Sequence, residues 1–228
     1  MRPPRLRPMP LNPNTPISYL ITDGRTTHDT DPSGAEFARL LALIAAGVAA
    51  GVTLIQVREK SLRPRLLYEL IAQAVAITKD SATRLLVNDH ADIALAAGAD
   101  GVHLTTRSLD ASTVRRISHS NFLIGVSTHS LEEARKAHAD GADFAVFGPV
   151  FDTPSKRAYG APPCGLELLR EAARELAPFP LLALGGITRD KLPQVLHAGA
   201  QGIAAIRLFN DVSKLGVVVK ELRETYVG

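Results

Sequence analysis

Polar side chains occupy every second position of one short segment, and this spacing is the first sign of chemistry in the chain. In "LIQVREK", Gln56, Arg58 and Lys60 follow an apolar start. If the segment is a strand, alternation sends these three side chains to one side and Glu59 to the other. One amide and two cations that converge suit a small acidic ligand. The other interpretation is a buried polar layer with a purely structural function.

Paired glycines after a later apolar run indicate a second site for an anion. Gly185 and Gly186 in "GGITRDK" stand between that run and a helical segment. Glycines let the backbone approach an anion closely, and free N–H groups at the start of a helix attract negative charge. A tight turn would use the same residues, so the place of this loop in the fold has to decide between the two interpretations.

The composition fits a small acidic ligand better than a nucleic acid. The net charge is only +3, and aromatic residues make up 5% of the chain. A nucleic-acid surface usually needs a basic stripe or a stacking platform. No segment approaches the roughly 20 uninterrupted apolar residues of a membrane helix. Cys164 is the only cysteine, which excludes an intrachain disulfide and favours a cytoplasmic protein. We expect neither a nucleic-acid partner nor a membrane partner.

Short apolar runs alternate with segments of helical spacing and predict the elements that position these residues. In "AAGVTLIQV", "AAGADGVHL", "ADGADFAVF" and "HAGAQGIAAI", a helix ends at Ala-Gly or Asp-Gly and a strand begins within a few residues. Glycine suits the left-handed position that ends a helix, and apolar runs suit strands buried on both faces. The expected strands cover residues 18–22, 53–57, 84–87, 101–104, 122–126, 144–148, 181–185 and 202–206.

This order of elements predicts an α/β fold, namely a closed (β/α)8 TIM barrel. Eight strands, each followed by a helix, and a length of 228 residues suit that barrel. A doubly wound open sheet is the alternative, but "TDGRTTHDT" stands where that fold would carry a glycine-rich dinucleotide motif. We expect a flexible Pro/Arg-rich tail over residues 1–16 and a single TIM-barrel catalytic domain over residues 17–228.

In a barrel, the polar segments that follow the strands lie together at one end. Chemistry in this fold occurs at the carboxyl ends of the strands, and phosphates often bind after strands seven and eight. The segments that follow the strands are "QVREK", "NDH", "HLTTRS", "STH", "GPVFDTPSK", "GGI" and "IR". The sequence therefore predicts one site at the mouth of the barrel, with the glycine pair as its phosphate loop.

These motifs, in this order, resemble those of the thiamine phosphate synthase family and of the thiazole tautomerases on the same barrel. The match runs from about Tyr19 to Arg207, and "QVREK", "NDHADIALA" and "GPVFDTPSK" are its most specific parts. The resemblance implies a transferase that joins hydroxymethylpyrimidine diphosphate to thiazole phosphate and releases diphosphate with the help of Mg²⁺. Such a dissociative reaction needs positive charge on the departing diphosphate and close placement of two rings.

The resemblance implies that one group of residues handles the diphosphate and the pyrimidine. Its members carry amide or cationic side chains: Gln56, Arg58, Lys60, Asn88 and Lys156. Asp89 would bind Mg²⁺, a hard cation that prefers carboxylate and phosphate oxygens. Ser127 would stand near the reacting carbon and the leaving group. Arg58, Ser127 and Lys156 are therefore the expected catalytic residues of this group.

A second group would receive the thiazole phosphate. Its expected members are Thr153, Ser155, Gly186 and Arg207. Arg207 departs from the family, which usually carries serine there. An arginine could strengthen a phosphate clamp through paired hydrogen bonds or fill the site and exclude the phosphate. His129 in "STH" stands where the tautomerases carry their proton-transfer residue, so it is a further catalytic candidate, although a histidine after a strand is more often structural.

The segment after the fourth strand departs from the synthase pattern. The synthases usually read "GVHLGQ" and then an acidic residue that supplies a second Mg²⁺ carboxylate, whereas this chain reads "GVHLTTRSLD". Thr105 and Thr106 replace Gly-Gln, and Ser108 replaces the acid, as in the tautomerases. Asp110 lies two residues later and is predicted to cap the next helix. The synthase is the favoured function because the anion-binding group is present. A thiazole tautomerase and a weakened ligand-binding barrel are the alternatives.

Two further expectations concern assembly and loops. Barrels of this family commonly form dimers, so the resemblance implies a homodimer. Residues 152–165 contain glycines and prolines that suit a mobile active-site loop, with a long static loop as the alternative.

Overall fold

Eight parallel strands form a closed barrel in the computed structural model, which describes residues 11–12, 14–153 and 162–227. The strands are β1 (Ile17–Ile21), β2 (Leu54–Val57), β3 (Arg84–Asn88), β4 (Gly101–Leu104), β5 (Leu123–Thr128), β6 (Phe144–Phe147), β7 (Leu181–Leu184) and β8 (Gly202–Ala205). Each strand pairs with the next along the chain, and β8 closes on β1. The predicted (β/α)8 barrel is confirmed, and the predicted strand bounds agree with these to within two residues.

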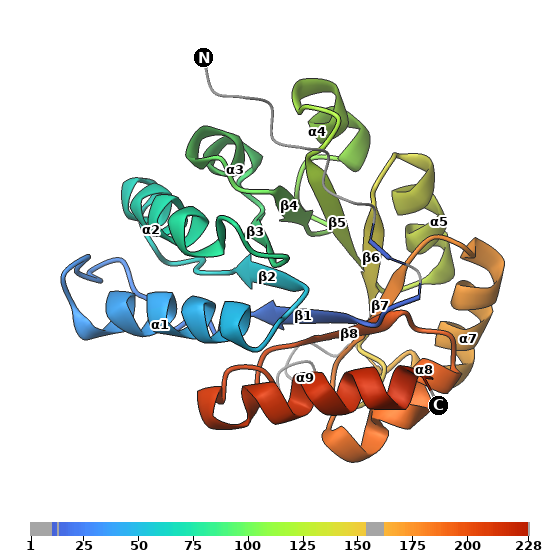
Figure 1. The fold of residues 1–228 in the computed structure, drawn as a ribbon. Helices are drawn as coiled ribbons and strands as arrows, with labels where there is room; N and C mark the ends of the chain where they lie inside the picture. The colour runs from blue at the N-terminus through green and yellow to red at the C-terminus, as the bar shows by residue number, and fades with distance from the viewer. Residues whose placement is uncertain (1–10, 13, 154–161, 228) are drawn as a thin grey trace.

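Helices surround the strands on the outside of the barrel (Figure 1). They are α1 (Ala35–Ala49), α2 (Pro64–Thr78), α3 (Ala91–Ala97), α4 (Ala111–Ile117), α5 (Leu131–Ala139), α7 (Gly165–Leu176), α8 (Leu192–His197) and α9 (Val212–Val227), with a short 3-10 helix, η1 (Arg189–Lys191), before α8. Gly98 ends α3 in the left-handed conformation, as its sequence pattern predicted. Among the described residues, no helix is long and apolar enough to cross a membrane.

Two apolar layers result from the alternation of side chains along the strands. One layer fills the barrel interior and includes Tyr19, Leu54 and Phe144. The other lies between strands and helices, where α1 packs so closely on β2 that a Cβ atom at Gly47 would lie 2.8 Å from Ile55 Cδ1. Each large apolar side chain that is fully buried contributes about 1.5–3 kcal/mol. The site-bearing ends of the strands therefore rest on a rigid core.

Side-chain hydrogen bonds join the first and last parts of the chain where the barrel closes. Asn210 Nδ2 donates to the carbonyl of Ile21 at 2.7 Å, Gln201 Nε2 to that of Asn12 at 3.0 Å, and Arg223 Nη2 to that of Gly51 at 2.7 Å. We call these three contacts, together with the β1–β8 ladder, the seam. Leu11 also packs against the interior cluster, so part of the expected flexible tail contacts the barrel.

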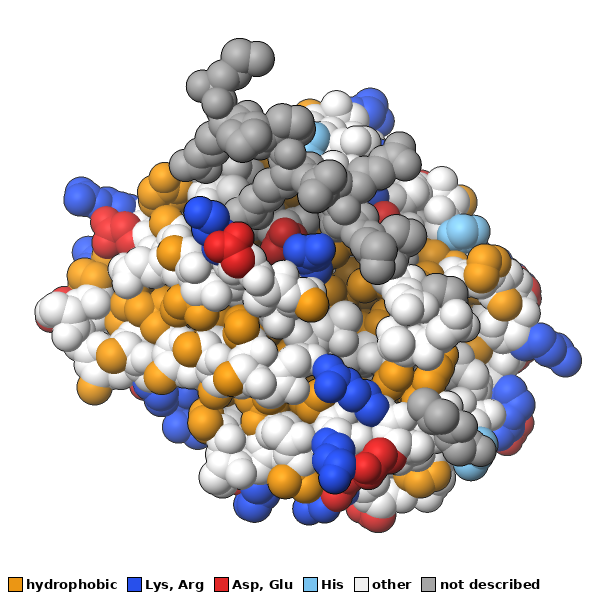
Figure 2. Space-filling model, in the orientation of Figure 1, with side chains coloured by type: hydrophobic (Ala, Val, Ile, Leu, Met, Phe, Trp, Pro, Cys, Tyr) orange, Lys and Arg blue, Asp and Glu red, His pale blue; other side chains and the backbone are white. Residues whose placement is uncertain are grey.

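The described part of the face seen in Figure 2 carries charges of both signs. Lys and Arg side chains are interspersed there with Asp and Glu side chains, and apolar side chains lie between them. This face therefore presents a mixed surface and not a field of one sign.

Candidate active site

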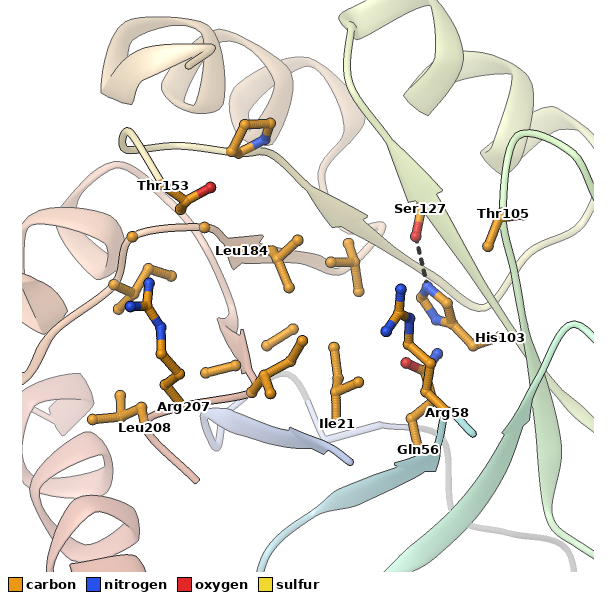
Figure 3. A pocket seen from close by; sticks show the side chains of 18 of the residues that line it. Ile21, Gln56, Arg58, His103, Thr105, Ser127, Thr153, Leu184, Arg207 and Leu208 are labelled. Atoms are coloured by element: carbon orange, nitrogen blue, oxygen red, sulfur yellow. Dashed lines mark hydrogen bonds between the residues drawn. The ribbon is translucent and has the colours of Figure 1, made fainter. Parts of the chain in front are cut away.

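A cavity of about 1110 Å³ opens at the carboxyl ends of the strands. One polar part of its lining comes from β2 to β5 and the residues after them, and a second comes from the segments after β6, β7 and β8, which include Thr153, Lys191 and Arg207. The strands β1, β6, β7 and β8 themselves supply mainly apolar side chains such as Ile21, Val146 and Leu184. Figure 3 shows Arg58 and Ser127 on one side, Arg207 on the other, and Ile21 and Leu184 between them. The cavity thus has two polar ends separated by an apolar floor.

The predicted residues of "QVREK" reach this cavity as the alternation required. Gln56, Arg58 and Lys60 all line it, and Gln56 is only 1% exposed. The Nε2 donor of Gln56 is buried close to the Tyr19 hydroxyl, and within the described residues neither atom has a hydrogen-bond partner of good geometry. Glu59 is buried on the opposite side of the segment. The three side chains therefore form one wall that offers an unpaired amide donor and two cations.

His103 lies beside this wall and was not predicted from the sequence. Its Nε2 atom lies 2.9 Å from the Ser127 hydroxyl, and its ring packs against Tyr19 at a centroid distance of 5.6 Å. Burial, and then the charge of Arg58, lowers the pKa of His103 to about 3, so the imidazole is neutral near pH 7. The signal was present, because "GVHL" places His103 on the inward-facing side of β4.

Asp89 does not line the cavity, but it directly follows Asn88, which does, and so lies at its rim. It is held by its neighbours on β4 and the loop after it. Its backbone adopts a φ of 70°, and its N–H donates to the carbonyl of His103 at 2.9 Å. The Ser108 hydroxyl donates to the Asp89 carboxylate and accepts the N–H of Thr105 at 2.7 Å. Asn88, the preceding residue, is buried and lines the cavity. The "TTRS" segment therefore folds around Ser108 and places that hydroxyl where a second carboxylate was expected.

The residues at this rim fit Mg²⁺ with a single protein carboxylate. No cluster of three His, Cys, Asp or Glu residues suited to a metal occurs in the described chain. Mg²⁺ keeps several waters and is usually held by one or two carboxylates plus substrate phosphates, so Asp89 meets the minimum. Asp110 does not help, because its carboxylate accepts from Lys136 Nζ at 3.1 Å. That contact also corrects the predicted cap, since Asp110 precedes α4 but makes no side-chain cap hydrogen bond.

The glycine pair forms a tight loop at the other end of the cavity. Gly185 and Gly186 have φ of 100° and 66°, and a Cβ atom at Gly186 would lie 2.7 Å from Phe151 Cβ. Lys191 braces the loop, because its Nζ donates to the carbonyl of Gly186 at 3.1 Å and lies 4.4 Å from the centroid of the Phe151 ring. Thr153 is buried and lines the same end. Pro149, Phe151 and Asp152 fill the space where a Cβ atom would stand, so the packing of this loop against the segment after β6 requires glycine at both positions.

Arg207 follows β8, and its exposed side chain lies along the wall of the open cavity (Figure 3). His129 also lines the cavity. Its Nδ1 atom bonds the carbonyl of Gly148, and its N–H donates to Glu133 Oε2 at 2.6 Å. Ser155 and Lys156 lie outside the described residues, as does most of the predicted loop. The described candidates except Asp89 therefore meet in one cavity.

Known proteins are similar to this chain over most of its length. A family model described as thiamine monophosphate synthase matches residues 19–209. A protein of Geobacter sulfurreducens is 45% identical over 188 residues, covering 82% of this chain and 84% of that protein. The thiamine-phosphate synthase of Methanoregula boonei is 40% identical over 206 residues, covering 90% and 91%. A solved structure of thiamine phosphate pyrophosphorylase from Pyrococcus furiosus superposes with a TM-score of 0.77 at 32% identity, covering 94% and 97%.

Proposed function

Because the chain belongs to the thiamine monophosphate synthase family, as its motifs predicted, we propose that its cavity joins hydroxymethylpyrimidine diphosphate to thiazole phosphate. The products are thiamine phosphate and diphosphate, which makes the protein a transferase of thiamine biosynthesis. The observation that carries this function is the division of one cavity into two cationic ends separated by an apolar floor (Figure 3). Two phosphorylated substrates with flat rings need that arrangement.

The diphosphate and the pyrimidine bind at the end formed by β2 to β5. Arg58 and Lys60 supply positive charge, and Asn88 adds an amide from the end of β3. The unpaired Nε2 donor of Gln56 is available to a ring acceptor of the pyrimidine, which would satisfy a buried group that is otherwise costly. Lys156, from outside the described residues, is proposed to add a further cation to the diphosphate.

Bond breaking at this end needs charge stabilisation more than it needs a nucleophile. The bond between the pyrimidine methyl carbon and the diphosphate oxygen breaks, and the electron pair leaves with the diphosphate. The lone pair of the thiazole nitrogen then forms the new C–N bond. Arg58 stabilises the negative charge that develops on the leaving group, and Ser127 stands beside the neutral imidazole of His103 as a hydroxyl contact.

Asp89 is the residue proposed to hold Mg²⁺, with the diphosphate as its other anionic partner. The metal would neutralise negative charge on the diphosphate when bound. The Ser108 hydroxyl donates to the Asp89 carboxylate, and Asp89 directly follows Asn88, which lines this end of the cavity. This arrangement supplies one carboxylate where relatives with an acidic residue would supply two.

The thiazole phosphate binds at the glycine end. Gly186 and Thr153 both line this end, where they are proposed to contact the phosphate. Arg207 is proposed to clamp the phosphate, because its guanidinium can donate two parallel hydrogen bonds to phosphate oxygens. Ser155 belongs to the same group by its motif but lies outside the described residues. The apolar floor between the two ends would bring the rings together and keep water from the cation.

The assay for this function mixes the purified protein with both substrates and detects thiamine phosphate by fluorescence after oxidation, with and without Mg²⁺. Metal-dependent product is the expected result, and Arg58→Ala should reduce its formation severely. A folded protein that forms no product would contradict the proposal. If that protein instead aromatised a thiazole carboxylate phosphate tautomer in a manner dependent on His129, the tautomerase alternative would replace it.

The proposal also includes a cellular location and an oligomeric state. A cytoplasmic location is supported by the single cysteine, which suits a reducing compartment. A homodimer is supported by the family resemblance alone, and sedimentation of the purified protein would test it.

A further inference from the structure

Glu59 carries a buried carboxylate that the proposed reaction does not use. It is 3% exposed and points away from the cavity into the loop after β1. Its oxygens accept four hydrogen bonds, from the Thr22 hydroxyl at 2.6 Å, the Gly24 N–H at 3.2 Å, the Thr26 N–H at 3.2 Å and the Thr26 hydroxyl at 2.8 Å. A buried carboxylate is costly unless such partners compensate it. All four partners belong to the segment 22–26, which is therefore organised around Glu59.

The Thr22 hydroxyl links the Glu59 carboxylate to the backbone of Arg58. Its only hydrogen points at Glu59, so its lone pairs are left for a donor. The backbone N–H of Arg58 donates to the same oxygen at 2.8 Å. Thr22 is fully buried, so water does not compete for these two hydrogen bonds. The carboxylate of Glu59 thus fixes the direction of the hydrogen bond that holds the backbone of Arg58.

The same loop covers Arg58 from one side. Gly24 has a φ of 70°, and a Cβ atom there would lie 3.3 Å from the carbonyl oxygen of Arg58 and 3.7 Å from its Nη1 atom. The Gly24 N–H is one of the four donors to Glu59. Backbone position and guanidinium position are therefore both set by a loop that Glu59 anchors.

The carboxylates of Asp23 and Glu59 contact groups other than the Arg58 guanidinium. Asp23, inside the loop, accepts from Arg39 Nη2 at 2.7 Å and pairs with Arg25 Nε at 2.9 Å. Glu59 itself is occupied by its four neutral donors. In the part of the chain that the structure describes, the Arg58 guanidinium has no carboxylate partner. Its charge is left for a ligand in the cavity.

From this geometry we propose that Glu59 and Thr22 are positioning residues, which act through Arg58 on the binding of the diphosphate group. The carboxylate and the hydroxyl form a relay that holds Arg58 at the cavity wall and keeps the nearby negative charge turned away from it. This inference rests on the proposed function, in which Arg58 contacts the diphosphate.

A matched pair of variants tests the relay. Thr22→Val and Thr26→Val each remove one buried hydroxyl that donates to Glu59, but only the Thr22 hydroxyl also accepts from Arg58. Calorimetry would measure the binding of inorganic diphosphate in Mg²⁺ buffer, and steady-state kinetics would give KM for each substrate. We expect Thr22→Val to weaken diphosphate binding roughly three- to tenfold, the usual range for one lost hydrogen bond. Thr26→Val should change it less than twofold.

The kinetic constants separate positioning from general loss of stability. Thr22→Val should raise KM for the pyrimidine diphosphate and leave KM for the thiazole phosphate unchanged, whereas a general loss of stability would affect both. The thermal midpoint should fall further in Thr22→Val than in Thr26→Val, because only Thr22→Val also leaves the Arg58 N–H without its acceptor. Equal diphosphate affinities in the two valine variants would overturn the relay. Arg58→Ala distinguishes the two proposals, because undiminished diphosphate binding in that variant would remove the proposed function of Arg58 itself. Loss in Arg58→Ala with equal valine variants would leave that function intact and reject only the relay.

Discussion

Replacing Ser108 with aspartate should convert the rim of the cavity into a stronger Mg²⁺ site. The Ser108 hydroxyl contacts the Asp89 carboxylate directly, so Ser108→Asp places a second carboxylate beside the first. Without metal, the two negative charges repel each other. Mg²⁺ would be held by both carboxylates and would offset that repulsion.

The size of the effect follows from the separation and exposure of the two groups. Two unit charges about 4 Å apart interact by about 1 kcal/mol in water and about 4 kcal/mol at an effective dielectric constant of 20. Asp89 is exposed, which favours the lower figure. In a chain of this size, about 1 kcal/mol shifts the thermal midpoint by roughly 2–4 °C. Ser108→Asp in chelator should therefore melt a few degrees below the wild type.

Thermal unfolding in chelator and in Mg²⁺ measures this without any activity assay. Mg²⁺ should raise the midpoint of Ser108→Asp by several degrees more than that of the wild type, because a ligand that binds the folded state stabilises it. Ser108→Ala is the control, since it removes the hydroxyl without adding charge. Equal Mg²⁺-induced shifts in wild type and Ser108→Asp would refute the assignment of Asp89 to the metal.

Three other expectations address the glycine loop, the phosphate clamp and the buried imidazole. Gly186→Ala should raise KM for the thiazole phosphate. Gly141→Ala is the control: Gly141 has a similar φ of 83° but no atom within 4 Å of the added Cβ, so this variant should lose only about 1–2 kcal/mol of stability. Matching KM values in the two variants would count against the proposed function of the glycine loop. Arg207→Ala should raise KM for the thiazole phosphate about tenfold and leave that for the pyrimidine diphosphate unchanged; a rise in both would reject the clamp. His103 has a folded pKa of about 3 against 6.5, so its stabilising effect is complete above pH 6.5 and falls by about 1.4 kcal/mol per pH unit below it. The free energy of unfolding of wild type relative to His103→Gln should decline accordingly in urea titrations, and a constant difference would be inconsistent with a buried neutral histidine.

The sequence predicted the barrel and most of its cavity because both depend on local periodicity. Alternation alone placed Gln56 and Arg58 on the cavity side and Glu59 on the other, and the structure confirms this. The barrel then brought the ends of eight strands together without any knowledge of side-chain contacts. The paired glycines were assigned to a loop after the seventh strand, and the structure places them in a tight loop there, where both have positive φ.

Features that depend on tertiary contacts were not predictable in this way. Asp110 occupies the N-terminal position of α4, but Lys136 from α5 takes its carboxylate. The hydrogen bond from Ser108 to Asp89 joins two loops, and no pattern in either loop indicates it. His103 was overlooked because an inward polar residue within a short apolar run looks like part of a core.

The seam has a consequence for how the chain folds. Neighbouring β/α units contact each other over short stretches of sequence, whereas Asn210 meets Ile21, and Gln201 meets Asn12, across 189 residues. Such contacts raise the contact order, and closing a loop of that length carries an entropic cost before any contact repays it. During synthesis the first strand stays without its second neighbour until the eighth has left the ribosome. Amide protons of β1 and β8 should therefore report the last cooperative step of folding.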